Sequence, residues 1–305
     1  MSRRGRLTLL SKNGKTVIGI VGLGVVGGAV QHYFKTTDYP LRLFDLYQGV
    51  GSPEEINEAD LIFICVPTPY QAGTGFDASA LEDALGRIEG SKVIVIKSTV
   101  LPGTTESFQV RYPQHRFLFN PEFLRQDYAR AEFLKPDRQI VGYCAESRHL
   151  AESVLALLPD APYRRVMLAR EAELTKYMAN SFLALKVTFA NEFFDLASAL
   201  DIDYEVVRDS VSADVRIGES HMHVAQDGYR GYGGKCLPKD TKAVLDLAER
   251  LGLPLHLMRT ADRVNATLLP PSEQPPSAPQ LIPISSNDEF EEIEADERVD
   301  EERAA

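Results

Sequence analysis

The segment TVIGIVGLGVVGGAV, residues 16–30, decides the fold of the first half of the chain. Its first six residues are mostly apolar and β-branched, which predicts a strand. Gly22, Gly24 and Gly27 then follow in the spacing G-x-G-x-x-G. At a turn from a strand into a helix, such glycines supply the tight turn, room for a pyrophosphate and close contact between helix and strand. The segment therefore predicts a dinucleotide-binding βαβ unit.

An acidic residue stands where such a unit binds the ribose of its cofactor. The next apolar run, LRLFD, ends in Asp45, about twenty residues beyond the glycines, as this fold requires. A carboxylate there binds a ribose 2′-hydroxyl and repels a 2′-phosphate. We therefore predict NAD rather than NADP as the cofactor.

Strand and helix patterns alternate further along the chain. Apolar runs at 61–69, 93–100, 117–123 and 138–143 are separated by helix-forming segments, which predicts a parallel sheet covered by helices on both faces. Ligands of such sheets bind at the carboxyl ends of the strands. The predicted cofactor-binding residues are Gly22, Gly24, Val25, Val26, Gly27, Asp45, Val66, Pro67, Thr68, Ser98 and Thr99. Glu122 falls at the same edge, although a turn residue there, or a helix-cap residue at Thr99, explains the pattern equally well.

A long helix is predicted in the second half. Residues 171–200 hold good helix formers without proline or glycine, enough for a helix of about 45 Å. Such a helix suits the spine of a second domain or a dimer interface. Lys176 and Asn180 are four apart and share one face. From spacing alone, the ordinary interpretation of Lys176 is a solvated surface residue.

The segment GYRGYGGKCLPKD, residues 228–240, predicts a reactive cysteine. Proline is favoured in the first turn of a helix, so a helix is expected to begin near Pro238, directly after Cys236. The helix N-terminus, Lys235 and Lys239 all favour the thiolate, and Asp240 lies one turn further on. An isolated cysteine is more often a packing residue, but this surrounding sequence favours an activated nucleophile.

The net charge of −11 is concentrated at the C-terminus. Residues 287–305 hold ten acidic and two basic residues, about −8 of the total, so the body gives no support to nucleic-acid binding. A proline-rich stretch precedes this run. Together they predict a disordered tail, with a peptide that docks on a partner as the less favoured interpretation.

The cysteines, the apolar runs and the histidines indicate where the protein resides and whether it binds a metal. The three cysteines show no paired spacing, which indicates a reducing compartment. We expect no membrane span and no signal peptide, and therefore a cytoplasmic protein. His221 and His223 lack further ligands at a suitable spacing, so no metal is predicted.

These patterns predict an α/β chain with four parts. A basic extension (1–15) precedes an NAD-binding, Rossmann-like domain with a doubly wound parallel sheet (16–160). An all-helical central domain built on one long helix (161–268) carries the catalytic and dimerisation roles. The disordered, acidic tail covers 269–305.

Several motifs together resemble one enzyme family. In order over residues 16–268 they are GLGVVGGAV, ADLIFICVPTP, KSTVLPGTT, FNPEFL, PDRQIVG, AELTKYMANSFLALKVTFANE, DVRIG and GYGGKCLPKD. The chain resembles the nucleotide-sugar 6-dehydrogenases of the UDP-glucose/GDP-mannose dehydrogenase family, most closely the UDP-glucose branch. The resemblance implies NAD-dependent oxidation of the C6 alcohol of UDP-glucose to the uronic acid, in two hydride transfers through a thiohemiacetal and a thioester on Cys236.

The resemblance also implies residue roles. Lys176 and Asn180 would bind the sugar oxygen and stabilise its negative charge, Asp240 with Thr99 would transfer protons, and Glu122 would serve hydrolysis. Arg216 would reach into the other subunit of a homodimer. The implied substrate-binding residues are Phe123, Leu124, Lys176, Asn180, Arg216, Tyr232, Gly233, Gly234 and Lys239.

Two departures from the family pattern bear on these roles. Many relatives carry a second glutamate where this chain has Gln126. Relatives also continue into a third domain that helps to hold the uridine diphosphate. Here the last predicted helix stops at Pro270, so we expect a compact form, or one completed by a partner chain.

Other functions remain open from the sequence. GDP-mannose 6-dehydrogenation is the nearest alternative. A β-hydroxyacid dehydrogenase would share the two-domain size but needs no cysteine. A non-catalytic nucleotide-sugar-binding protein, or one subunit of a split enzyme, would not need the thiol either.

Overall fold

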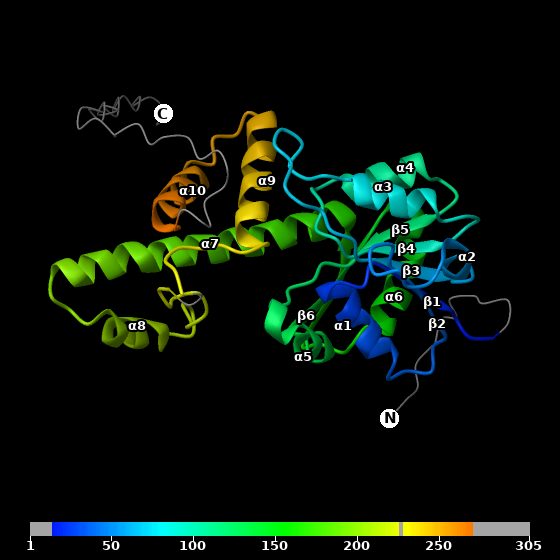
Figure 1. Ribbon diagram of the computed structural model, residues 1–305, viewed down its shortest axis with the longest axis horizontal. Helices are drawn as coiled ribbons and strands as arrows, with labels where there is room; N and C mark the ends of the chain where they lie inside the picture. The colour runs from blue at the N-terminus through cyan, green and yellow to red at the C-terminus, as the bar shows by residue number, and fades with distance from the viewer. Residues whose placement is uncertain (1–13, 226–227, 271–305) are drawn as a thin grey trace, which may run out of the picture. The chain divides into compact units, whose positions relative to one another are not determined.

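The computed structural model describes residues 14–225 and 228–270 (Figure 1). The predicted N-terminal extension and the predicted tail therefore lie almost wholly outside the described residues. The described chain begins with an α/β domain, and a helical part follows it.

One seven-stranded sheet forms the centre of the first domain, in the order β2-β1-β3-β4-β5-β6-β7. The strands are β1 (Ile18–Val21), β2 (Leu41–Phe44), β3 (Leu61–Ile64), β4 (Val93–Ile96), β5 (Arg116–Phe119), β6 (Arg138–Tyr143) and β7 (Tyr163–Leu168). Neighbours pair in parallel except β5 and β6, which pair antiparallel. The predicted Rossmann-like sheet is confirmed.

The final strand was not predicted. β7 is the sequence YRRVML, whose first three residues are exposed at the sheet edge, so it lacks the apolar run that marks the other strands. It pairs with β6 along its full length and extends the sheet past residue 160. The boundary between the two domains at 160 stays a prediction.

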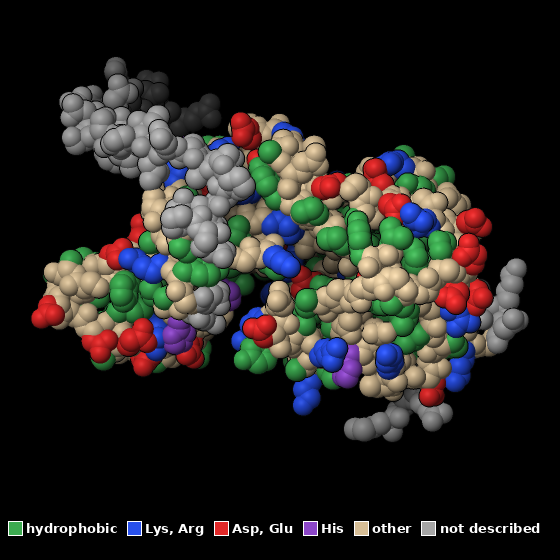
Figure 2. Space-filling model, in the orientation of Figure 1, with side chains coloured by type: hydrophobic (Ala, Val, Ile, Leu, Met, Phe, Trp, Pro, Cys, Tyr) green, Lys and Arg blue, Asp and Glu red, His purple; other side chains and the backbone are tan. Residues whose placement is uncertain are grey.

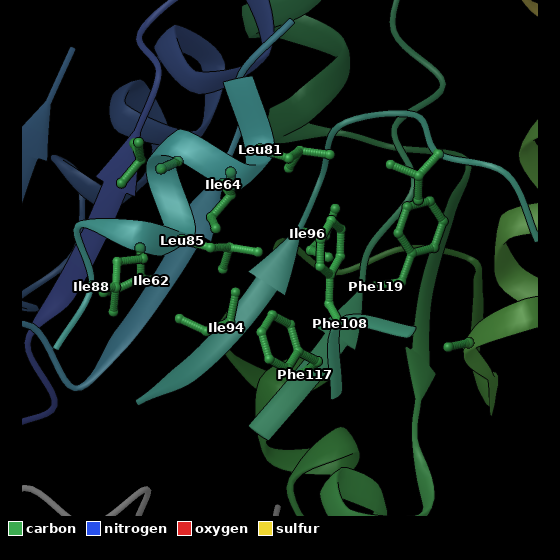
Figure 3. Close-up of a cluster of buried hydrophobic side chains, with 14 of the residues drawn as sticks. Ile62, Ile64, Leu81, Leu85, Ile88, Ile94, Ile96, Phe108, Phe117 and Phe119 are labelled. Carbon is green, nitrogen blue, oxygen red and sulfur yellow. The ribbon is translucent and has the colours of Figure 1, made fainter. Parts of the chain in front are cut away.

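Helices cover both faces of the sheet because each strand presents alternate side chains to opposite faces. Ile62, Ile64, Ile94, Ile96, Phe117 and Phe119 point to one face, where Leu81, Leu85, Ile88 and Phe108 pack on them (Figure 3). Ile18, Ile20, Leu61, Phe63, Val95 and Leu118 form the opposite core. Each strand is therefore apolar on both sides, as the continuous runs predict.

The helices of the first domain are α1 (Val25–Phe34), α2 (Pro53–Ile56), α3 (Ser79–Gly86), α4 (Thr104–Arg111), α5 (Ala129–Leu134) and α6 (Ala151–Leu157). Two 3₁₀ helices, η1 (Gln126–Tyr128) and η2 (Ala145–Leu150), precede α5 and α6. The helical part consists of α7 (Ala169–Ala199), α8 (Tyr204–Ser212), α9 (Leu237–Arg250) and α10 (His256–Leu268).

The 31-residue helix α7 joins the two parts and confirms the predicted long helix. Its first turns pack closely on β6 at Gly142. A Cβ atom there would lie 2.8 Å from Ala169 Cα and 2.9 Å from Ala172 Cβ, so only glycine allows this approach. Further along, α8, α9 and α10 pack against α7 (Figure 1). Residues on α7 and α9 are thereby held beside the carboxyl edge of the sheet.

Candidate active site

A cleft of about 890 Å³ opens at the carboxyl edge of the sheet. Its walls come from the glycine turn, the ends of β2, β3 and β4, the segment after β5, and the start of α9. Every predicted cofactor-binding residue except Gly27 lines it, and so do Glu122, Leu124, Cys236 and Lys239. Tertiary structure therefore brings the predicted dinucleotide motif and the predicted nucleophile to one cavity.

The glycine turn has the geometry that a dinucleotide needs. Gly22 has φ +84°, and a Cβ atom there would lie 2.9 Å from the carbonyl oxygen of Cys65. A Cβ atom on Gly27 would lie 1.8 Å from the Gly22 carbonyl oxygen, so α1 can pack this closely only with glycine. A Cβ atom on Gly24 would meet nothing within 4 Å, which leaves open space before the N-terminus of α1. These residues fit a pyrophosphate at that helix end.

Asp45 lies at the end of β2 and closes the turn. Its Oδ2 accepts a hydrogen bond from the N–H of Leu23 at 2.6 Å, and its Oδ1 accepts one from the N–H of Gln48 at 2.9 Å. The side chain is nearly buried yet lines the cleft. A carboxylate so oriented suits a ribose diol.

The strand ends are tied together by hydroxyl groups. Thr68 Oγ1 donates to the carbonyl oxygen of Thr99 at 2.8 Å, and Ser98 Oγ donates to that of Val66 at 2.6 Å. These bonds join the segments that leave β3 and β4. Thr68 and Ser98 thus shape the cleft wall.

Lys176 forms an ion pair with Glu122 inside the protein. Lys176 Nζ lies 3.1 Å from Glu122 Oε1, and Lys176 is 4 % exposed. Burial acts to raise the pKa of Glu122, but Lys176, the N–H of Leu124 (2.8 Å) and the charge of Lys97 together hold that pKa below its ordinary value. The ordinary expectation of a solvated Lys176 is therefore wrong, because α7 turns this side chain toward the sheet edge.

Asp240 is held from two sides. Asn180 Nδ2 donates to Asp240 Oδ2 at 2.5 Å, and Lys239 Nζ donates to Asp240 Oδ1 at 2.5 Å. Asp240 is 1 % exposed, so its charge is balanced inside the protein. Neither Asn180 nor Asp240 lines the cleft directly.

Cys236 immediately precedes α9, as predicted, and Pro238 lies in the first turn of that helix. The predicted preference for thiolate is wrong. Although the residue is exposed, partial burial of its sulfur raises the thiol pKa, and the charges of Glu122 and Asp240 raise it further. Lys176 and Lys239 act in the opposite direction. Sequence spacing revealed Lys239 but not the nearby glutamate, which comes from another domain.

Lys97 is a cleft residue that the sequence analysis missed. It directly follows β4, is 2 % exposed, and its Nζ donates to Asn120 Oδ1 at 2.6 Å. Burial lowers the pKa of Lys97 to about 8, while the charges of Cys65 and Glu122 raise it and that of Lys176 lowers it. The sequence feature that could have identified Lys97 is its position directly after an all-apolar strand.

Other predicted substrate residues lie outside the cleft lining. Arg216 is exposed and pairs with Asp214 at 2.5 Å. Phe123 packs under the guanidinium of Arg138, with 3.7 Å from the Arg138 Cζ to the ring centre. Tyr232, Gly233 and Gly234 lie in the glycine-rich loop before Cys236.

The sequence analysis predicted neither a metal site nor a membrane span. Within residues 14–225 and 228–270, no three His, Cys, Asp or Glu side chains are grouped to hold a metal ion. No described helix has the length and apolar character to cross a membrane. His223 instead lies 3.1 Å from Glu219.

Fold and cleft together define a Rossmann-type dinucleotide-binding protein with a cysteine facing the dinucleotide site. Residues 44–157 match the NAD binding domain of the UDP-glucose/GDP-mannose dehydrogenase family, and residues 170–267 match that family's central domain. The chain belongs to this family, and NAD is the cofactor of the matched domain. The glycine turn precedes the matched residues and rests on its own geometry.

Individual relatives agree with this assignment. The chain is 34 % identical over 246 residues to the putative UDP-glucose 6-dehydrogenase YtcA of Bacillus subtilis, covering 76 % of this chain and 56 % of the relative. It is 35 % identical over 233 residues to a UDP-glucose 6-dehydrogenase of Pseudomonas aeruginosa, covering 70 % and 50 %. The chain thus spans about half the length of the curated relatives it matches.

The similar solved structures include a member of the same family and a protein that shares only the fold. A UDP-glucose dehydrogenase from Pyrobaculum islandicum superposes with a TM-score of 0.74 at 31 % identity, over 85 % of this chain and 70 % of that one. A 3-hydroxyisobutyrate dehydrogenase from Mycobacterium tuberculosis reaches a TM-score of 0.64 at 19 % identity, over 83 % and 93 %. The latter shows a shared fold alone.

Proposed function

We propose that this chain oxidises C6 of a nucleotide sugar, with UDP-glucose as the first candidate, to the uronic acid in two NAD-dependent steps. The observation that carries the proposal is the position of Cys236 in the same cleft as the glycine turn and Asp45. A thiol is unnecessary for binding a nucleotide sugar, whereas it is the group that retains an aldehyde between two oxidations.

The residues around the cysteine suit the first oxidation. NAD held in the cleft would supply the acceptor for the hydride that leaves C6 as the alcohol becomes an aldehyde. Lys176 and Asn180 stabilise the negative charge that develops on the sugar oxygen. Asp240, which is bonded to Asn180 and Lys239, takes up the alcohol proton through a water shared with Thr99.

The second half of the reaction uses the thiol. The Cys236 sulfur adds to the aldehyde carbon while the thiol proton passes to the aldehyde oxygen, which gives a thiohemiacetal. Loss of the hydroxyl proton and of the hydride on C6, for which a second NAD would be the acceptor, then gives a thioester. Water then attacks the thioester carbonyl, Glu122 accepts a proton from that water, and the C–S bond breaks to release the carboxylate and the thiol. The buried ion pair with Lys176 keeps Glu122 ionised for this role.

The remaining predicted residues belong to the same proposal. Leu124 and Lys239, which line the cleft, contact the sugar nucleotide, with the segments that hold Phe123 and Tyr232, Gly233 and Gly234 beside them. Arg216 belongs to the site of a second subunit. We also propose a cytoplasmic location, because Cys65, Cys144 and Cys236 are all free. The domain limits 16–160 and 161–268 are part of this proposal.

GDP-mannose is the second candidate substrate. A GDP-mannose dehydrogenase from Pseudomonas aeruginosa superposes with a TM-score of 0.59 at 25 % identity, over 82 % of this chain and 68 % of that one. The first curated relatives are instead UDP-glucose 6-dehydrogenases. UDP-glucose is therefore the substrate to test first.

The decisive experiment counts NADH formed per UDP-glucose consumed, with the uronic acid measured in parallel. We expect about two NADH for the wild type, since the thiol carries the substrate through both oxidations. Cys236→Ser should form no uronic acid. Cys144→Ala, which removes a buried thiol outside the cleft, should retain the wild-type ratio.

Two results would contradict the proposal. One NADH per sugar would indicate a simple alcohol dehydrogenase. Bound NAD with no NADH from UDP-glucose or GDP-mannose would indicate a binding protein.

A further inference from the structure

The loop that carries Cys236 is held at Tyr232 by one side chain from α10. Asn265 Oδ1 accepts a hydrogen bond from the Tyr232 N–H at 2.6 Å, and Asn265 Nδ2 donates to the Tyr232 carbonyl oxygen at 2.8 Å. Asn265 is 4 % exposed. The amide thus satisfies both backbone groups of one loop residue away from water.

The backbone conformation at Gly231 allows this contact. Gly231 has φ +82°, and a Cβ atom there would lie 2.6 Å from Asn265 Oδ1 and 3.1 Å from Leu268 Cβ. Only glycine lets the loop approach α10 in this way. The Tyr232 ring lies in a buried cluster with Ala184 and Val187 of α7, against which Leu237 of α9 packs, and its hydroxyl lies beside Asp262 of α10. The backbone of Tyr232 is therefore attached to α10 through Asn265, and its side chain is enclosed by α7, α9 and α10.

Cys236 follows Tyr232 by four residues. The intervening Gly234 has φ +71°, so this short connection includes a backbone conformation that glycine adopts easily. On its other side, Cys236 is fixed by α9, where Asp240 bonds to Asn180. The thiol is thus placed by two attachments, α9 after it and the Asn265–Tyr232 contact before it.

The same loop has a second attachment, through Arg230, that does not involve Asn265. Arg230 Nε donates to Asn191 Oδ1 at 3.0 Å, and Arg230 also pairs with Asp195 at 2.8 Å. These contacts hold the loop against α7 at a residue two positions further from the cysteine along the chain. Along the sequence, the contact from α10 is the closer of the two to Cys236.

We propose that Asn265 is a positioning residue for Cys236, and that α10 controls the active site through the Asn265–Tyr232 contact. An amide is required because one side chain must both accept and donate. The catalytic consequence rests on the proposed dehydrogenase function, but the placement of the thiol does not.

The test compares Asn265→Ala and Asn265→Asp with the control Asn57→Ala. Asn57 makes the same kind of double backbone contact, to the Arg87 carbonyl oxygen (2.9 Å) and the Glu89 N–H (2.8 Å), in the first domain outside the cleft. Three quantities are measured: the unfolding midpoint, the alkylation rate of each cysteine by iodoacetamide resolved by mass spectrometry, and the kinetic constants.

We expect Asn265→Ala to alkylate Cys236 about threefold faster or more, because a released loop exposes the partly buried sulfur. We expect kcat to fall about tenfold or more, since misplacement of a reacting group by about 1 Å can cost up to about a hundredfold. The affinity for NAD should change less than about twofold, because the glycine turn is untouched. Asn265→Asp, which keeps an acceptor for the Tyr232 N–H, should fall between, and it serves if the alanine variant does not fold.

The proposal is overturned if the Asn265 variants lose stability as Asn57→Ala does while Cys236 alkylation stays at or below the wild-type rate. A wild-type protein that makes no NADH would instead overturn the proposed function. The alkylation result would still decide the positioning role.

Discussion

At the residue scale, Cys236 lies among two ammonium groups and two carboxylates. Lys176 and Lys239 favour the thiolate, whereas Glu122, Asp240 and partial burial favour the thiol. Each carboxylate is itself paired with a cation, Glu122 with Lys176 and Asp240 with Lys239. Substrate that draws Lys176 toward its own oxygen therefore changes the charge around Glu122 and the thiol together.

Lys97 gives a prediction about stability at this scale. Its pKa is about 8 in the folded protein against an ordinary 10.5, so folding costs free energy while Lys97 is charged, and the cost disappears as the pH rises from 8 to 10.5. The shift corresponds to about 3 kcal/mol, and leaving the buried Asn120 Oδ1 without its donor offsets about 1–3 kcal/mol. Lys97→Met should therefore stabilise the protein by up to about 2 kcal/mol at about pH 7.

Urea unfolding at about pH 7 and about pH 9.5 measures this effect, because the gain over the wild type should shrink at the higher pH. Lys92→Met is the control, since Lys92 bonds to the Asn57 carbonyl oxygen outside the cleft. We also expect Lys97→Met to be less active, because Glu122 loses a favourable charge. A variant less stable than the wild type at both pH values would contradict this account of Lys97.

At the element scale, α7 both joins the domains and supplies the site. Its first turns pack on β6, its next turns carry Lys176 and Asn180, and its remainder supports α8, α9 and α10. A shift of α7 would therefore move Lys176 relative to Glu122, which comes from the sheet. Its attachment to the first domain must be firm.

One buried carboxylate supplies much of that attachment. Glu173 on α7 accepts hydrogen bonds from the Gly103 N–H (2.6 Å), the Thr105 N–H (2.8 Å) and Thr105 Oγ1 (2.6 Å), at the first turn of α4. Glu173→Ala leaves these donors buried without acceptors. We expect it to lower the free energy of unfolding by about 2–4 kcal/mol, as chemical denaturation would measure.

Glu106→Ala is the matched control, because it breaks an exposed ion pair between the same two helices, Arg170 to Glu106 at 2.6 Å. Such a surface pair is worth about 1 kcal/mol or less. Equal losses for the two variants would contradict the role assigned to Glu173.

At the scale of the whole molecule, α7 presents an apolar stripe without a cover among the described residues. Its large exposed side chains are Leu174, Met178, Phe182, Phe189, Phe193 and Leu196. Their spacings of three, four and seven place them along one side of the helix. Figure 2 shows hydrophobic side chains among acidic ones at the surface formed by α7 and α8. The stripe supports the homodimer that the long helix predicts, because a second copy would present the same face.

Phe182→Asp should therefore convert a dimer into a monomer, as light scattering coupled to size-exclusion chromatography would measure. A charge placed in an apolar interface costs several kcal/mol. Val110→Asp is the control, because Val110 is 80 % exposed on α4 away from this stripe. A wild-type monomer, or a Phe182→Asp variant that stays dimeric, would contradict dimerisation through α7.

The local sequence determined the elements and the motifs that depend on near neighbours. Gly22, Gly24 and Gly27 predicted the turn because each serves a backbone requirement within one βα unit. The long helix followed from a run free of proline and glycine, and the position of Cys236 before α9 followed from Pro238. Strand β7 was not predicted because its residues do not form an apolar run.

Only the tertiary structure decided charge and contact between distant segments. Burial of Lys176 against Glu122, the raised pKa of Cys236 and the cleft position of Lys97 each depend on groups from different elements. Asn265 acts on a loop 33 residues earlier in the chain. Electrostatic interaction and hydrogen bonding depend on distance in space and on burial, and a sequence fixes neither quantity for residues far apart along it.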